Sequence, residues 1–140
     1  MIVVDDHTLF RVLARRVDLV LANLIADGIV TTASWYFRLA RALSTGRTDG
    51  MLSRQLEALP DAAQAEIRAA LDALPAYVEI VNPRTIVPLM ATIATITPLN
   101  FLTLEALATA IATNADIATA TATPLFQNAA DRLHITVHIV

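Results

Sequence analysis

The stretch that decides the fold is the beginning of the chain, residues 1–14, MIVVDDHTLFRVLA. A short apolar run at 2–5 ends in two acids, Asp5 and Asp6, and is followed by apolar residues with helical spacing. A buried strand that ends in carboxylates and leads into a helix is typical of α/β proteins with a parallel sheet. Because such sheets bind ligands at the carboxyl ends of their strands, Asp5 and Asp6 are candidate site residues.

The rest of the chain continues this alternation of strand and helix. Short runs rich in Val, Ile and Thr predict strands at 2–5, 28–32, 77–81, 116–120 and 134–140. Amphipathic or capped segments predict helices at 8–26, 34–43, 51–59, 61–74, 84–96, 102–113 and 124–133. We therefore expect one domain over 1–140, a three-layer α/β/α sandwich around a central parallel five-stranded sheet. A helical pair at about 51–74 separates the second and third strands, after a loop at 44–50.

Composition excludes several kinds of site. The sequence has no cysteine and no lysine, so disulfides, thiolate zinc sites, cysteine nucleophiles and lysine amines are all ruled out. Its net charge of −3 gives no overall attraction to nucleic acid. Apolar residues make up 56% of the chain, more than is usual for a soluble domain, and this surplus predicts either a sheet covered on both faces or an additional buried interface.

Two features bear on the compartment. The acids at positions 5 and 6 interrupt the first apolar run, so we expect no signal peptide. The uncharged stretch 85–104 is about as long as a membrane helix, but Pro98 predicts that it divides into two core helices. We expect a cytoplasmic protein without a membrane span.

The opening residues resemble the start of a response-regulator receiver domain, in which paired acids hold Mg²⁺ beside a phosphorylated aspartate. The receiver pattern also needs a late lysine, which this chain lacks, and an acceptor aspartate at the end of the third strand. Asp49 is the only acid near that position, and it lies in a Gly- and Arg-rich loop. The receiver interpretation is therefore rejected.

A second resemblance extends through most of the chain. The segments VVDDHTLF (3–10), VTTASWYFRLARAL (30–43) and the C-terminal part 102–140 resemble, in order and spacing, the PIN-domain ribonucleases that act as toxins in toxin–antitoxin pairs. The resemblance implies a site of four acidic positions that bind Mg²⁺ or Mn²⁺. Here the first is Asp5, the second is replaced by Arg38, the third is Glu105 and the fourth falls on Ala122.

This incomplete acidic set leaves three functions open. The first is a weak or non-catalytic PIN-like protein that acts by binding protein or RNA. The second is an active Mg²⁺- or Mn²⁺-dependent endoribonuclease in which Asp5 and Glu105, with Asp6 or Asp116, hold one ion weakly. The third is a structural subunit of an oligomer. The resemblance also implies a homodimer and an antitoxin-like protein partner.

Two side-chain hypotheses complete the prediction. Arg38 is expected to take the place of the cation and to pair with Asp5 and Glu105, because buried carboxylates need a counter-charge. Asp6 is expected to be the N-cap of the first helix, and a metal ligand only secondarily.

Overall fold

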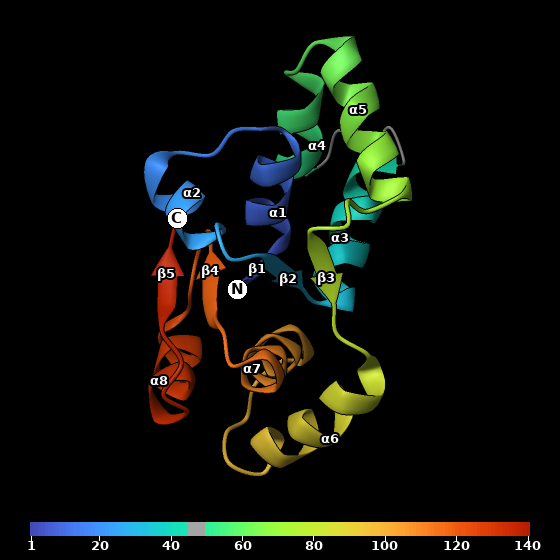
Figure 1. The fold of residues 1–140 in the computed structure, drawn as a ribbon. Coiled ribbons are helices and arrows are strands. Elements are labelled where there is room, and N and C mark those ends of the chain that lie inside the picture. The colour runs from blue at the N-terminus through green and yellow to red at the C-terminus, as the bar shows by residue number, and fades with distance from the viewer. Residues whose placement is uncertain (45–49) are drawn as a thin grey trace.

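The protein is built on a five-stranded sheet in which every strand pairing is parallel. The computed structural model describes residues 1–44 and 50–140, without the side chain of Ser44. The strands are β1 (Ile2–Val4), β2 (Ile29–Thr31), β3 (Val78–Ile80), β4 (Asp116–Thr119) and β5 (Val137–Ile139), in the order β3-β2-β1-β4-β5 (Figure 1). The predicted fold class is confirmed, and each strand lies within its predicted range.

The strand order changes direction at the middle of the sheet. β1 pairs with β2 on one side and with β4 on the other, with Val4 opposite Thr31 and Ala118. The chain thus builds outward from β1 to β3, then returns to the other side of β1 for β4 and β5. A crevice forms at the carboxyl ends of the two strands that flank such a switch point, and here these strands are β1 and β4.

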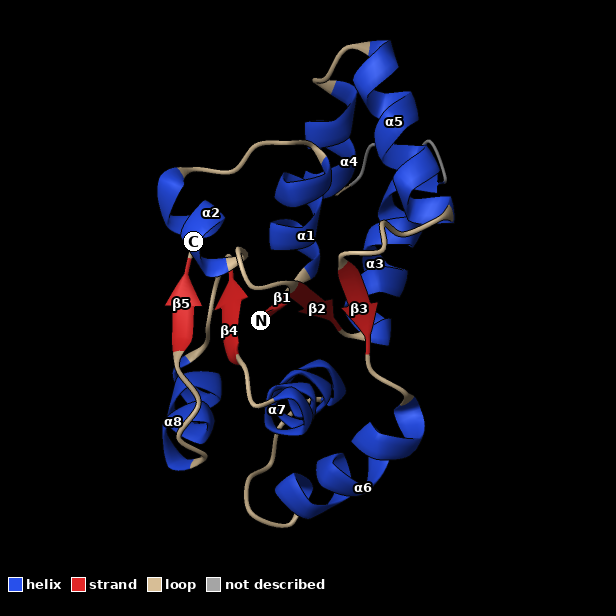
Figure 2. Ribbon diagram, viewed as in Figure 1, coloured by secondary structure: helices blue, strands red, loops and turns tan. Residues whose placement is uncertain are grey.

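Helices cover both faces of the sheet and form the outer layers of the sandwich (Figures 1 and 2). On one face lie α1 (Asp6–Leu13), α2 (Leu19–Leu24), α3 (Ala33–Ser44), α4 (Met51–Glu57) and α5 (Asp61–Asp72). On the other lie α6 (Pro83–Ala94), α7 (Phe101–Thr113) and α8 (Pro124–Arg132). The pair α4 and α5 corresponds to the helical pair predicted at about 51–74.

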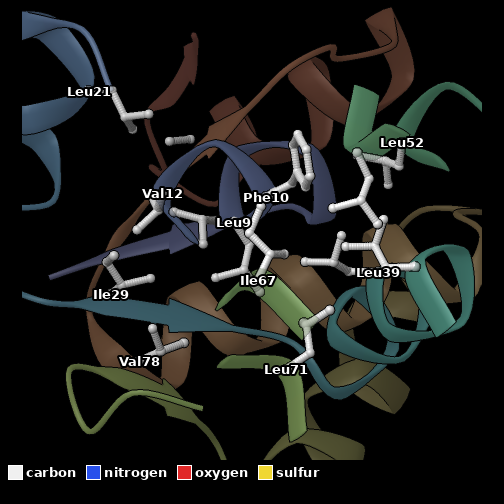
Figure 3. Close-up of a cluster of buried hydrophobic side chains, with 14 of the residues drawn as sticks. Leu9, Phe10, Val12, Leu21, Ile29, Leu39, Leu52, Ile67, Leu71 and Val78 are labelled. Atoms are coloured by element: carbon white, nitrogen blue, oxygen red, sulfur yellow. The ribbon is translucent and has the colours of Figure 1, made fainter. Parts of the chain in front are cut away.

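Alternate residues of each strand face opposite cores. Ile2 and Val4 of β1 belong to the cluster under α1 and α3–α5, whereas Val3 between them belongs to the cluster under α6–α8. Figure 3 shows the first cluster, in which Leu9 and Phe10 of α1 meet Leu39 of α3 and Ile67 of α5. The central strand β1 is buried on both faces and is continuously apolar, whereas the outer strands β3 and β5 are partly exposed and contain Glu79 and His138.

One helix was predicted wrongly. The segment 8–26 forms two helices, α1 and α2, instead of one. Arg15 has a left-handed φ of 56°, which a continuing helix cannot contain, and Asp18 begins α2 by accepting a hydrogen bond from the Leu21 N–H. Most of the predicted loop 44–50, including Asp49, lies outside the described residues.

The uncharged stretch 85–104 divides as predicted. α6 ends at Ala94 and α7 begins at Phe101, with Pro98 in the connection between them. Asn100 begins α7 as its N-cap. Within the described ranges 1–44 and 50–140, no helix is both long and apolar enough to span a bilayer.

Candidate functional site

Asp5 lies at the carboxyl end of β1, at the switch point of the sheet. Its Oδ1 accepts a hydrogen bond from the Thr8 N–H at 2.7 Å, so Asp5 is the N-cap of α1. Its Oδ2 accepts bonds from the Thr119 hydroxyl at 2.7 Å and from the Ala120 N–H at 2.9 Å. The side chain therefore links β1 to the end of β4 and begins a helix, and it is only 6% exposed.

The capping prediction was wrong by one residue. Asp6 is the first residue of α1, after the cap at Asp5. A residue in the first turn of a helix turns its side chain sideways, whereas the capping residue folds back over the N–H groups. Asp6 thereby faces Arg38 of α3, with Nη2 of Arg38 3.2 Å from Oδ2 of Asp6.

Asp6 is nevertheless poorly satisfied. It is 3% exposed, and its Oδ2 accepts no hydrogen bond from any described residue, although Arg38 lies within ion-pair distance. Burial raises the pKa of Asp6 above its usual range; the positive charge of Arg38 opposes this rise, and the negative charge of Asp5 adds to it. Arg38 itself keeps a half-exposed side chain.

Arg38 does not make the contacts that were predicted for it. Its recorded ion pair is with Asp6, and Asp5 is satisfied by uncharged donors instead. The hypothesis that this arginine bridges Asp5 and Glu105 is corrected accordingly. Arg38 still places a positive charge near Asp5, because its partner Asp6 follows Asp5 directly in the chain.

Glu105 belongs to a neighbouring pocket. Its Oε2 accepts a hydrogen bond from the Ser34 N–H at 3.2 Å, at the first turn of α3. It lines a pocket of about 220 Å³ with Ser34, Ile86 and Met90, and Asp5 is absent from that lining. The carboxylate thus compensates the N-terminus of α3 and ties α7 to it. Glu105 and Asp5 therefore line different pockets.

Asp116 lies at the opposite edge of the sheet. It is the first residue of β4 and sits opposite Ile2, so it is separated from Asp5 by about 10 Å along the strand direction. Its carboxylate accepts from the Thr136 N–H at 3.2 Å and lies 3.4 Å from Nε2 of His138. The structure therefore does not bring Asp116 together with Asp5, Asp6 or Glu105.

A pocket of about 330 Å³ opens at the carboxyl edge beside Asp5. Four parts of the chain line it: the start of α1, the first turns of α3, the start of α7 and the segment from β4 into α8. The lining residues are Asp5, Asp6, His7, Trp35, Arg38, Asn100, Leu102, Thr103, Thr119, Thr121, Thr123 and Phe126. Five of these twelve side chains are uncharged hydroxyl or amide groups, and three are charged.

Sequence reasoning missed several of these residues. Asn100 caps α7 by accepting from the Thr103 N–H, and Thr123 caps α8 by accepting from the Phe126 N–H. Both had a readable signal, since an Asn or Thr directly before an apolar helical run is typical of a helix start. What the sequence could not indicate is that both caps face the pocket beside Asp5.

The donor set at this edge does not fit a divalent cation. A search of the described residues finds no group of three or more acidic or histidine side chains able to hold a metal ion. Three of the roughly four acceptor positions of the Asp5 carboxylate are used by protein donors. The permanently charged guanidinium of Arg38 would also repel Mg²⁺ or Mn²⁺.

Arg11 of α1 and Arg15, which follows α1, each take part in an ion pair. Nη2 of Arg11 lies 2.9 Å from Oδ2 of Asp18, and Nη2 of Arg15 lies 3.7 Å from Oε2 of Glu66.

Compared with models of known protein families and with curated proteins, the chain gives no match. The chemistry of the site therefore has to be argued from its geometry: a polar pocket with one half-exposed cation and one buried, under-satisfied carboxylate.

Proposed function

We propose that this chain is a PIN-like domain, related to the ribonuclease toxins, that binds single-stranded RNA without cleaving it. The proposal depends most on one observation, the three hydrogen bonds that the Asp5 carboxylate accepts from uncharged donors. The donors are the Thr119 hydroxyl at the end of β4, the Ala120 N–H after it and the Thr8 N–H in the first turn of α1. In an active enzyme of the kind that the sequence resembles, this acid would be a metal ligand.

The other acidic positions support loss of cleavage. The second holds Arg38, the third has Glu105 turned to the N-terminus of α3, and the fourth falls on Ala122. A two-metal mechanism needs bridging carboxylates that hold both ions near the attacking and leaving oxygens. Asp5 alone cannot supply that charge.

RNA is favoured as the ligand because of where the pocket lies and what lines it. It opens at the carboxyl edge of β1 and β4, where parallel α/β sheets bind nucleotides. Arg38 offers a half-exposed guanidinium, whose fork of donors suits a phosphate. Hydroxyl and amide side chains around it suit the sugar and base edges of an unpaired nucleotide.

Two measurements on one RNA test this proposal. Binding of a fluorescently labelled single-stranded RNA is followed by anisotropy, and the same RNA is then incubated with the protein and Mn²⁺ and analysed for cleavage. We expect binding that weakens with salt, and no cleavage above that of a buffer control. Mn²⁺-dependent cleavage that Asp5→Asn abolishes would contradict the proposal and favour the active endoribonuclease.

A gain-of-metal variant makes the negative result informative. Arg38→Glu combined with Ala122→Asp restores acids at the second and fourth positions that the resemblance assigns. We expect calorimetric titration with Mn²⁺ to show clear binding by this double variant and none by the parent chain. Arg38→Met with Ala122→Asn is the matched control, because it removes the guanidinium without adding acids. Tight Mn²⁺ binding by the parent chain would contradict our account of the site.

A structural role in an oligomer is the second candidate, and the exposed apolar surface from α6 to the start of α7 favours it. Val87, Ile96 and Phe101 are each more than half exposed, and no charged residue occurs between Thr85 and Leu104. Figure 1 shows α6 as the outermost helix on its side of the sheet. An uncharged face is complementary to itself, so a second copy of the chain is the occupant we propose. Sedimentation equilibrium should show a dimer that Val87→Glu dissociates; an unchanged mass would contradict this.

A further inference from the structure

We infer that the pocket beside Asp5 holds one ribonucleotide of the bound RNA, with its phosphate on Arg38 and a ribose hydroxyl donating to Asp6. This inference rests on the proposed function and deepens it, because it names the group that the site recognises. It uses neither a metal ion nor Glu105. It predicts that the protein distinguishes RNA from DNA.

The first observation is the unsatisfied oxygen of Asp6. A carboxylate that is 3% exposed normally accepts several hydrogen bonds, yet Oδ2 of Asp6 accepts none from the described residues. Such an oxygen is costly unless a donor reaches it. A ribose 2′-hydroxyl is a donor of the right kind, and acidic side chains at the edge of parallel sheets hold ribose hydroxyls in this way.

The second observation is the position of Arg38. Its Nη2 covers Oδ2 of Asp6 at 3.2 Å, while about half of the side chain is exposed to solvent at the pocket. Since the ion pair lacks a directed hydrogen bond, a phosphate offers the guanidinium better geometry than Asp6 does. Movement of Arg38 toward the phosphate would uncover Oδ2 for the ribose.

The third observation is the charge of the helix ends. α7 and α8 both begin at this pocket, capped by Asn100 and Thr123. Each N-terminus carries a partial positive charge that attracts phosphate. The cap uses Oδ1 of Asn100, which leaves its amide N–H₂ as a donor for a ligand. Together with Arg38, these groups offset the acids beneath them.

The acids oppose a phosphate less than their number suggests. The negative charge of Asp6 is opposed by the guanidinium of Arg38, whose Nη2 lies 3.2 Å from Oδ2 of Asp6. The charge of Asp5 is already balanced by three hydrogen-bond donors. The pocket volume, about 330 Å³, lies at the small end of ligand sites and suits a single nucleotide.

Trp35 makes this inference directly measurable. It is the only tryptophan of the sequence, it lines the pocket, and it is 6% exposed. Because the chain has no other tryptophan, its emission reports on the wall of this pocket and on the apolar cluster behind it. The experiment titrates the full chain with a single-stranded RNA, with DNA of the same sequence, and with inorganic phosphate, and records tryptophan emission.

We expect RNA to bind at least about tenfold more tightly than DNA, the effect of one hydrogen bond to a charged acceptor. Asp6→Ala should reduce this preference to near one, and Asp6→Asn, which keeps an acceptor oxygen, should retain part of it. Arg38→Met should weaken RNA and DNA equally. Asp18→Asn, a change at an exposed helix cap away from the pocket, is the matched control and should behave as the parent chain.

The outcomes separate the two proposals. One outcome is RNA binding that is detected by anisotropy without a change in Trp35 emission, and a second is RNA binding that is unaffected by Asp6→Ala and Arg38→Met. Either result would contradict binding in this pocket but would agree with the proposed RNA-binding function. Equal affinity for RNA and DNA overturns the ribose contact. If inorganic phosphate binds as tightly as RNA, the pocket is a simple anion site, and the inference that it recognises a nucleotide is wrong. Absence of any RNA binding overturns the proposed function itself.

Discussion

The starts of α1 and α2 use the same device in different surroundings. Asp5 accepts from the Thr8 N–H at 2.7 Å, and Asp18 accepts from the Leu21 N–H at 2.9 Å, so each helix begins with an aspartate cap of the same spacing. Asp5 is 6% exposed and takes two further donors from beyond its helix. Asp18 has a side chain that is 59% exposed, and its partner Arg11 has one that is 27% exposed.

The surroundings reverse the electrostatics of the acids at these two helix starts. The N–H of Leu21 and the guanidinium of Arg11 hold the pKa of Asp18 below its usual range. At the start of α1, burial raises the pKa of Asp6 despite Arg38. The cap motif decides where a helix begins, but burial decides whether the acids beside it are solvated, structural or available to a ligand.

The largest difference between the two regions should come from removing the caps. Asp5→Ala removes the acceptor of three hydrogen bonds that join β1, α1 and the end of β4, and leaves buried donors unsatisfied. We expect a loss of about 3 kcal/mol of unfolding free energy, measured by urea denaturation. Asp5→Asn, which keeps one acceptor oxygen, should lose less. A loss below about 1 kcal/mol for Asp5→Ala would show that the link to β4 contributes little.

The link between the strands can be weakened without touching the cap. Thr119→Val removes the hydroxyl that donates to Asp5 at 2.7 Å and keeps the β-branched shape of the side chain. We expect a loss of about 1.5 kcal/mol in the same denaturation experiment, because the bond is buried and its acceptor is charged. Thr121→Val is the matched control. Thr121 is exposed, and only its backbone oxygen contacts the Thr119 hydroxyl, so the stability of this variant should stay close to that of the parent.

The two regions should also respond oppositely to pH. Asp6 binds its proton more tightly in the folded state, so its contribution stabilises the protein below the usual carboxyl pKa and is lost as pH rises through the raised pKa. The free energy of unfolding of Asp6→Asn, measured from about pH 4 to neutral, should lack this decline. An identical pH profile for the variant and the parent would show that Asp6 is not perturbed.

The smallest effect is expected at α2. Asp18 has a lowered pKa, so its contribution is present above the usual carboxyl pKa and is lost as pH falls through the lowered one. Asp18→Ala should destabilise less than Asp5→Ala, and the loss should shrink further in high salt because the Arg11 pair is exposed. A salt-independent loss as large as that of Asp5→Ala would remove the distinction between the two caps.

The errors in the predicted site have physical causes. Sequence reasoning alone could have excluded Asp116 from the site at Asp5. The first residue of a parallel strand lies at the amino edge of the sheet, whereas Asp5 lies at the carboxyl edge. The partner of Arg38 could not have been identified from the sequence, since a long side chain on α3 can reach either Asp5 or Asp6. The choice depends on which acid takes the capping position, and local propensity for that position is the same for both.

What the sequence determined by itself is the succession of strands and helices along the chain and the parallel direction of the strands. Continuously apolar runs separated by amphipathic ones are sufficient for a parallel sheet covered on both faces, because burial on two sides leaves no other pattern. Only the tertiary structure decided the state of each acid. Asp5 is saturated because Thr119 and Ala120 meet it across the switch point. Asp6 is left short of a donor because its nearest cation is half in solvent. Such contacts join residues more than thirty positions apart, and no local pattern encodes them.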